Sequence, residues 1–274
     1  MREFALKIIG ILGEVKNGNG RKKELRNMDP VKPHYGYYAL PILALLSAII
    51  FAMGILVAVF LWPFVGLVLT GFGLYIILTY GMSLLLMNQH VASELPTIIE
   101  IRGDEKVLDV GCGLGKMTIG IAKVLKEGKV IGIDIWDKME IMGNSPERAY
   151  QNARIEGVKD KVEFKYGNIL DIPFIGNSFN LVTAQSVLNN LHGIMDKSKA
   201  LTEIRRVLEP RGKFLALEPL RNLRGFLTFT PIAFWSLLTK DEWMKLLKKA
   251  EFINIRYTYE NGLGIFSAEK PSKD

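Results

Sequence analysis

The sequence has 274 residues, a hydrophobic fraction of 49% and a formal net charge of +7. This length accommodates one domain of ordinary size and a smaller part. The single cysteine, Cys112, excludes an intramolecular disulfide framework, and no His and Cys residues have the spacing of metal ligands, so we expect no metal. Nucleic acid is not an expected partner, because much of the positive charge precedes residue 38 and no stripe of basic and aromatic residues follows.

Residues 1–37 are expected to form a basic juxtamembrane segment, because basic residues outnumber acidic ones there about two to one. Apolar residues between Phe4 and Val15 are compatible with one face of a short helix lying on a membrane surface. A disordered basic tail is an equally good interpretation, because Gly18 and Gly20 interrupt the pattern early.

Residues 38–88 predict a transmembrane helical hairpin, since no Lys, Arg, Asp or Glu occurs from Tyr35 through Ser93. Two apolar runs, Ala39 to Leu61 and Val65 to Met87, are long enough at ~1.5 Å per residue to cross a hydrocarbon core of ~30 Å. A tight turn is expected between them, at Trp62, Pro63 and Phe64. The alternative, a buried hairpin in a soluble core, would show polar residues on an outward face.

The charges also predict a topology. Two spans return the chain to the side on which it began, and the basic segment favours the cytoplasmic side. We therefore expect a two-pass protein of the cell membrane, with both termini and the domain of residues 89–274 in the cytoplasm. His90, just past the second span, is expected at the membrane interface.

Residues 89–274 alternate between helix and strand patterns, which predicts a mainly parallel sheet with helices on both faces. Two further strands near the C-terminus flank Asn261-Gly262, a strong hairpin signal. The fold class is therefore α/β, doubly wound and seven-stranded, with a C-terminal antiparallel hairpin. Strands are expected at 107–110, 129–134, 162–166, 180–184, 213–217, 253–259 and 263–268, and helices at 116–126, 144–156 and 197–208.

The most informative stretch is the glycine turn after the first of these strands. Gly111, Gly113 and Gly115 let the backbone bend sharply and approach a ligand, and the N-terminus of the next helix favours negative groups. Asp134 ends the second strand, where a carboxylate can hold a ribose diol. The spacing G-x-G-x-G differs from the G-x-G-x-x-G of dinucleotide sites, but Asp134 alone does not separate the two cofactor classes.

The string from Val107 to Gly115 resembles motif I of the class I S-adenosylmethionine-dependent methyltransferases. Residues 167–180 are similar to the GD…LPF…NSFD stretch of the ubiquinone and menaquinone branch of that family, although Asn168 and Asn180 depart from its pattern by replacing Asp. The resemblance implies a Rossmann-like methyltransferase fold and S-adenosylmethionine as cofactor. The cofactor-binding residues that it implies are Asp109, Gly111, Cys112, Gly113, Gly115, Asp134, Ile135, Asn168, Ile169 and Gln185.

The resemblance also assigns parts of the cofactor to these residues. Asp134 falls at the ribose hydroxyls, Asn168 at the adenine amino group and Ile169 on the adenine ring. The carbonyl oxygen of an Asn side chain can still accept a hydrogen bond from the amino group, so the replacement of Asp preserves that contact. Cys112 is interpreted as a small filler inside the turn and not as a nucleophile.

Two residues are candidates for the acceptor side, Gln185 at the end of the fourth strand and His192 beyond it. A phenol or enol acceptor needs a base, and His192 is the one titratable residue that the sequence places there, although a lone histidine is more often structural. The apolar insertion at residues 219–238 is either core or a lid that touches the bilayer, with Arg221 and Arg224 near headgroup phosphates.

The first hypothesis is a membrane-anchored methyltransferase acting on a small, apolar or lipid-like acceptor such as an isoprenoid quinone. The alternatives are a membrane-tethered NAD(P)-dependent oxidoreductase and a non-catalytic cofactor-binding module. The sequence indicates neither the methylated atom nor the oligomeric state.

Overall fold

The computed structural model describes residues 32–36, 40–86, 101–138, 140–141, 143–229, 231–260 and 262–272. The chain divides into two compact units, Met1–Lys32 and Pro33–Asp274, and the described helices and strands belong to the second. The basic segment through residue 31, His90 and Asn261 lie outside the described residues.

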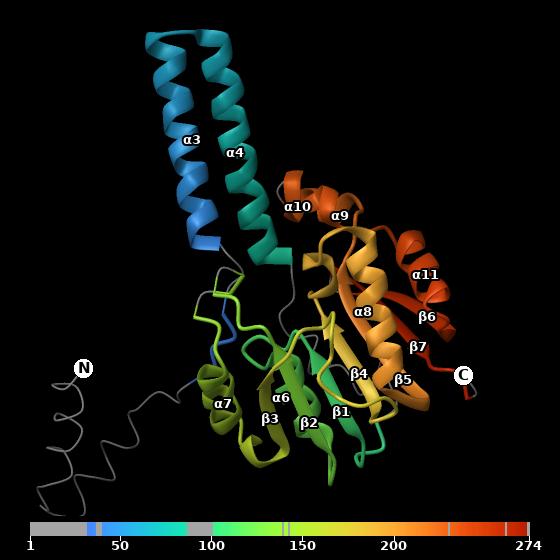
Figure 1. The fold of residues 1–274 in the computed structure, drawn as a ribbon. Coiled ribbons are helices and arrows are strands. Elements are labelled where there is room, and N and C mark those ends of the chain that lie inside the picture. Colours follow the sequence, from blue (N-terminus) through green and yellow to red (C-terminus); the bar gives the residue numbers. More distant parts are fainter. Residues whose placement is uncertain are drawn as a thin grey trace, which may run out of the picture. The chain divides into compact units, whose positions relative to one another are not determined.

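Two long apolar helices, α3 (Leu40–Phe60) and α4 (Pro63–Leu86), form the predicted helical hairpin (Figure 1). Their backbones approach closely at glycine, because a Cβ on Gly66 would collide with Ala58. The turn between the helices is shorter than the sequence suggests. Pro63 is the first residue of α4, a position where proline lacks no needed N–H and its fixed φ suits the helix.

The hairpin exposes apolar side chains and buries polar ones. Leu56 and Leu67 are 57% and 67% exposed, whereas Ser47 and Thr79 are buried. The hydroxyl of Thr79 donates to the carbonyl of Ile76 at 2.9 Å, within its own helix. This distribution is the reverse of that in a water-soluble helical pair.

Only one described helix satisfies the criterion for crossing a membrane by length and composition, Pro63–Met82 within α4. The apolar stretch of α3, Leu45–Phe60, is shorter. The expected pair of spans is therefore met by one helix and not by two.

A seven-stranded sheet with the order β3-β2-β1-β4-β5-β7-β6 lies at the centre of the remaining chain. The order in which strands are added reverses between β1 and β4, because β2 and β3 lie on one side of β1 and β4 and β5 lie on the other. In open α/β sheets, ligands bind in the crevice at the carboxyl ends of the two strands at such a point. The strands are β1 (Lys106–Val110), β2 (Lys129–Asp134), β3 (Val162–Tyr166), β4 (Phe179–Gln185), β5 (Leu208–Pro219), β6 (Ile253–Glu260) and β7 (Leu263–Glu269).

Strands β1 to β5 pair in parallel, and β7 pairs antiparallel with both β5 and β6, so the C-terminal hairpin is as predicted. The largest boundary difference is at β5, which is expected from residue 213 but begins at Leu208. The reason is an additional pairing of Phe179 with Leu208, separated from the regular register by an irregularity before Leu181.

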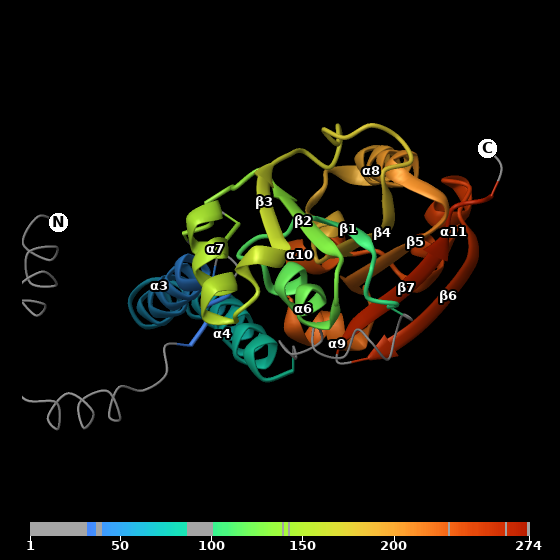
Figure 2. The ribbon, with the colours of Figure 1, turned by 90° about the horizontal axis from the view of Figure 1, so that it is seen from below.

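Helices cover both faces of the sheet, as the view from below shows (Figure 2). On one face, α6 (Lys116–Val124) and α7 (Pro146–Ile155) pack against the sheet through buried residues such as Ile121 and Ala149. On the other face, α8 (Gly193–Val207) and α11 (Lys240–Lys249) pack against the sheet through buried residues such as Leu201 and Trp243. Among the described residues, the remaining short elements are two 3₁₀ turns, η2 (Lys159–Lys161) and η3 (Leu188–Asn190), and two helices, α9 (Leu223–Thr228) and α10 (Pro231–Ser236).

Candidate cofactor and acceptor site

The glycine turn follows β1 at the carboxyl edge of the sheet. Gly111 and Gly113 have φ angles of +68° and +49°, which residues with a Cβ rarely adopt. The amides of Gly111 and Cys112 both donate to the carbonyl of Ile133, at 2.8 and 3.0 Å, so β2 fixes the turn. A Cβ on Gly111 would collide with Val187, which places the loop after β4 directly on the turn.

Asp134 ends β2 and faces this turn, as the sequence predicts. Its Oδ2 accepts the amide of Gly113 at 2.8 Å, and its Oδ1 accepts the amide of Trp136 at 2.7 Å and the side-chain amide of Asn144 at 3.2 Å. A carboxylate has about four lone-pair directions, so one remains for a ribose hydroxyl. The neighbouring Ile135 is exposed.

Asp109 and Cys112 lie beneath the turn. Asp109 is buried and accepts the hydroxyls of Thr118 at 2.6 Å and Thr183 at 2.8 Å, which ties β1 to α6 and to β4. Cys112 is also buried, and its sulfur lies against Gly132 of β2. Both side chains support the turn, and direct contact of either with a cofactor stays a prediction.

The residues expected at the adenine follow β3. The Oδ1 of Asn168 accepts the amide of Leu170 at 2.9 Å, so the oxygen assigned to the adenine amino group already closes a local turn. Ile169 is buried in the core that includes Ile133 and Leu188. Asn180, the other departure from the family pattern, is structural: its Oδ1 accepts the amide of Lys106, and its Nδ2 donates to Glu209.

Two further features at the turn are not apparent from the sequence. Lys116, the first residue of α6, has a pKa lowered to about 8 by burial, and no described residue forms an ion pair or hydrogen bond with its ammonium. The Lys116 ammonium at this position can pair with the carboxylate of an amino-acid group bound at the turn. Its position directly after the last glycine is the signal that could have indicated it.

The second feature is the segment of residues 33–36, which precedes the hairpin and lies against the turn. Asn152 of α7 is buried, and its Nδ2 donates to the carbonyls of His34 and Leu114, both at 3.0 Å. Its Oδ1 accepts the amide of His34 at 3.0 Å. A Cβ on Gly36 would lie 3.0 Å from Cδ1 of Leu114. No local sequence pattern predicts contacts between residues so far apart in the chain.

Of the two acceptor-side candidates, the structure brings only Gln185 to the turn. Gln185 is the half-buried last residue of β4, one position beyond Ala184, which pairs with Val110 of β1. His192 is exposed at the residue before α8, where it makes no side-chain capping bond. Its role as a base stays a prediction.

The 219–238 segment is partly core and partly surface. Leu220, Leu237 and Leu238 are buried, whereas Leu223 and Trp235 are 77% and 69% exposed. Arg221 has a partner within the domain, and its expected contact with headgroup phosphates stays a prediction. Its Nη2 pairs with both carboxylate oxygens of Glu242, at 2.7 and 2.8 Å, within the capping box of α11.

Two buried carboxyl groups predict that stability depends on pH. Burial raises the pKa of Asp109 to about 6 and that of Glu218, at the end of β5, to about 7. Because both values exceed those of an unfolded chain, the native state binds these protons more tightly, and the stabilisation is lost as pH rises through 6 and 7. We expect the free energy of unfolding to be about 2–3 kcal/mol larger at pH ~5.5 than at pH ~8.

Denaturant unfolding in detergent, followed by tryptophan fluorescence, measures this difference. Asp109→Asn and Glu218→Gln should flatten the pH dependence, even where they lower stability. Stability that rises over this pH range in the wild type would contradict the prediction.

Comparison with known proteins adds to this geometry. A family model described as a methyltransferase domain matches residues 101–251. A demethylmenaquinone methyltransferase of Symbiobacterium thermophilum is 33% identical over 161 residues, which are 58% of this chain and 60% of the relative. One of Lactiplantibacillus plantarum is 37% identical over 132 residues, 48% of this chain and 52% of the relative. The chain thus spans a little over half the length of these curated relatives.

Solved structures show the same fold. A methyltransferase of Methanosarcina mazei, described as S-adenosylmethionine-dependent, aligns with a TM-score of 0.51 and 25% identity over 62% of this chain and 94% of that one. Another so described, from Aquifex aeolicus, has a TM-score of 0.53 and 20% identity over 69% and 96% of the two chains. With the family model covering more than half of its residues, the chain belongs to the S-adenosylmethionine-dependent methyltransferase family.

Proposed function

We propose that this chain is a membrane-anchored methyltransferase that transfers the methyl group of S-adenosylmethionine to a small apolar acceptor of the quinone type. One contact carries the proposal: α4, the candidate membrane span, touches the apolar segment after β5. The hydroxyl of Tyr75 donates to the carbonyl of Phe226 at 3.3 Å, and the two ring centroids are 6.0 Å apart. Since β5 ends at the sheet edge that carries the glycine turn, an acceptor dissolved in a bilayer would have a short path to the cofactor.

The hairpin supports the anchor. Apolar side chains cover its outside and its polar hydroxyls face inward, which suits lipid better than water. If α3 crosses the bilayer together with α4, the hairpin returns the chain to the side of the basic segment, and both termini and the methyltransferase domain would lie in the cytoplasm. A tether of this kind raises the effective concentration of a membrane-dissolved acceptor at the site.

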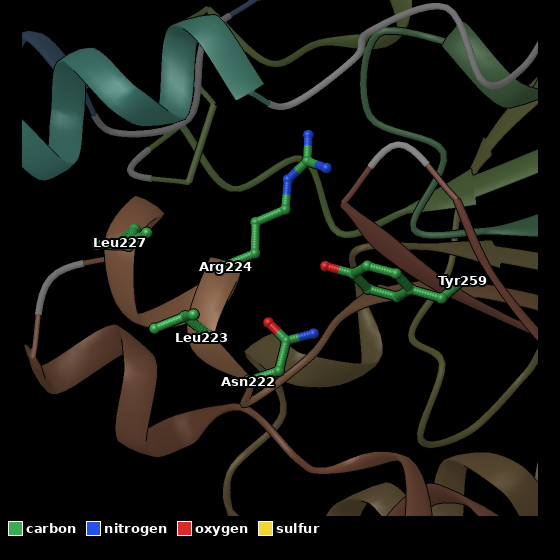
Figure 3. A pocket seen from close by; sticks show the side chains of 5 residues that line it. All are labelled: Asn222, Leu223, Arg224, Leu227 and Tyr259. Carbon is green, nitrogen blue, oxygen red and sulfur yellow. The ribbon is translucent and has the colours of Figure 1, made fainter.

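The names of the relatives support the acceptor class, since demethylmenaquinone is an apolar quinone. A shallow pocket of about 380 Å³ is lined mainly by apolar surface, which suits an apolar acceptor. It lies between α9 and β6 and not at the glycine turn, so we assign it to acceptor entry and not to the cofactor. Figure 3 shows Leu223 and Leu227 on one side of it and the hydroxyl of Tyr259 directed across it, with Asn222 and Arg224 completing its wall.

The chemistry asks for positioning more than for covalent catalysis. S-adenosylmethionine supplies an already activated methyl group on its sulfonium. The glycine turn and Asp134 would hold the cofactor, Gln185 would lie beside the methionine portion, and the apolar segment after β5 would exclude water. An acceptor methylated at a phenol or enol carbon would also need a base, for which His192 is the candidate.

The decisive test is methyl transfer. Full-length protein in detergent is incubated with methyl-labelled S-adenosylmethionine and a total membrane lipid extract, and the labelled product is identified by mass spectrometry. We expect the label in a quinone-type lipid. S-adenosylmethionine binding without transfer to any component would favour the non-catalytic module, and label only in water-soluble molecules would exclude the apolar acceptor.

The anchor has its own test. We expect the full-length protein in the membrane fraction, released by detergent and retained after a wash with alkaline carbonate, because a spanning hairpin does not depend on surface charge. A protein that stays in the aqueous fraction without detergent would contradict the anchor while leaving the methyltransferase assignment in place.

A further inference from the structure

Glu218, the penultimate residue of β5, is fully buried and holds the loop that follows β4. Its Oε1 accepts the amides of Val187 at 3.0 Å and Leu188 at 2.8 Å, and its Oε2 accepts the amide of Asn189 at 3.3 Å. Three successive backbone N–H groups therefore converge on one carboxyl group. Such an arrangement suits an anionic or strongly accepting group.

Further hydrogen bonds hold the same loop, some from the backbone of β5 and others from α8. The amide of Ser186 donates to the carbonyl of Leu217 at 2.8 Å, and the side-chain amide of Asn189 donates to the carbonyl of Pro219 at 2.9 Å. From α8, the ammonium of Lys197 donates to the carbonyls of Asn189 at 3.2 Å and Leu191 at 2.7 Å. The loop is thus fixed by β5 and α8 in addition to the hydrogen bonds of its own 3₁₀ turn, η3.

The loop lies at the point where the strand order reverses. Val187 occupies the space next to Gly111, and Asn190 donates to Glu140 of the loop after β2 at 3.4 Å. Gln185, at the start of the loop, ends β4. The loop consequently forms the wall of the crevice between β1 and β4, where a ligand of this fold would lie.

We propose that Glu218 is a positioning residue for methyl transfer: it fixes residues 186–191 so that Gln185 and Val187 flank the place where acceptor and cofactor meet. This inference rests on the proposed function. Glu218 touches neither ligand and acts through the three amides that it binds. Because transfer requires the reacting atoms to be held close and in line, a loop displaced by about 1 Å lowers turnover by up to roughly a hundredfold.

The chain offers a matched control for this proposal in Glu105, just before β1. Glu105 is also buried, and it accepts two backbone amides, those of Arg102 at 2.6 Å and Gly103 at 2.8 Å. It lies at the amino edge of the sheet, opposite the glycine turn. Glu105→Ala therefore removes a similar buried carboxyl group without disturbing the crevice.

The experiment compares full-length Glu218→Ala, Glu218→Asp, Glu218→Gln and Glu105→Ala in detergent. We expect Glu218→Ala and Glu218→Asp to lower kcat about 10- to 100-fold, with S-adenosylmethionine affinity changed less than about threefold, because β2 holds the glycine turn independently. Glu218→Gln keeps an oxygen for Val187 and Leu188 and should restore kcat to within about threefold of the wild type. Glu105→Ala should leave the kcat of the folded protein unchanged.

Hydrogen exchange provides a measurement that needs no acceptor. The amides of residues 187–189 should exchange faster in Glu218→Ala and Glu218→Asp, but not in Glu105→Ala. If Glu218→Ala does not fold, the Asp variant decides. A folded Glu218→Asp variant with the kcat of the wild type would overturn the proposal. Equal losses of kcat in Glu218→Ala and Glu105→Ala would overturn it as well. An inactive wild type whose loop exchange still depends on Glu218 would instead refute the proposed function and confine Glu218 to holding the loop.

Discussion

Gly113→Val is expected to weaken S-adenosylmethionine binding at least about a hundredfold while leaving the sheet folded. Gly113 has a φ angle of +49°, and a Cβ there would lie 2.9 Å from Cδ1 of Ile141. Its amide also donates to Asp134, the residue expected at the ribose. A β-branched side chain would be strained at this φ and would move the amide, so the turn and the ribose site would be lost together.

Isothermal titration with S-adenosylmethionine and with its demethylated product measures the effect, and circular dichroism checks the fold. The matched control is Gly157→Val after α7. Gly157 has a similar φ angle of +72°, but no atom lies within 4 Å of the position of a Cβ. Backbone strain is therefore similar in the two variants, and only Gly113→Val should lose the cofactor. Unchanged affinity in Gly113→Val would move the binding site away from the turn.

The sequence predicts those parts of the fold that depend on local patterns. The strand β3 agrees residue for residue with the prediction, because its apolar alternation and flanking turn residues are local. The turn at Gly111 is likewise predictable, since glycines at that spacing have few other uses. In contrast, the early start of β5 depends on the pairing of Leu208 with Phe179, which no local pattern contains.

The same distinction separates the site residues. Asp134 and Gln185 follow from their positions at strand ends. Glu218 is also at a strand end, but its importance lies in amides about 30 positions away in the chain. Asn152 contacts a segment more than a hundred positions away. Because these partners come together only in the folded chain, no local sequence pattern indicates the roles of Glu218 and Asn152.

The exposed apolar side chains of α9 and α10 give the second large expected effect. Leu223 and Trp235 are mostly exposed, and Phe226 between them contacts both Tyr75 of α4 and Phe234 of α10. If this surface enters the bilayer, each of the two side chains contributes roughly 1.5–3 kcal/mol when fully buried. Replacing both by Ser should therefore weaken docking of the segment on lipid, and turnover of a bilayer-dissolved acceptor, by about a hundredfold or more.

The controls for this double variant come from the opposite edge of the sheet. Ile175 and Ile253 are also exposed; Ile175 precedes β4 and Ile253 is the first residue of β6, at the edge of the sheet where the parallel strands begin. Replacing this pair by Ser removes similar apolar surface away from α4 and should change neither turnover nor S-adenosylmethionine affinity. Turnover is measured in liposomes and again with the acceptor dispersed in detergent. Because lipid docking is needed only in liposomes, the loss in the Leu223→Ser/Trp235→Ser variant should be much larger in liposomes than in detergent, where only the contribution of Leu223 to the entry pocket remains. An equal loss in both media would show that these side chains shape the acceptor site itself, and no loss in liposomes would exclude them from the membrane.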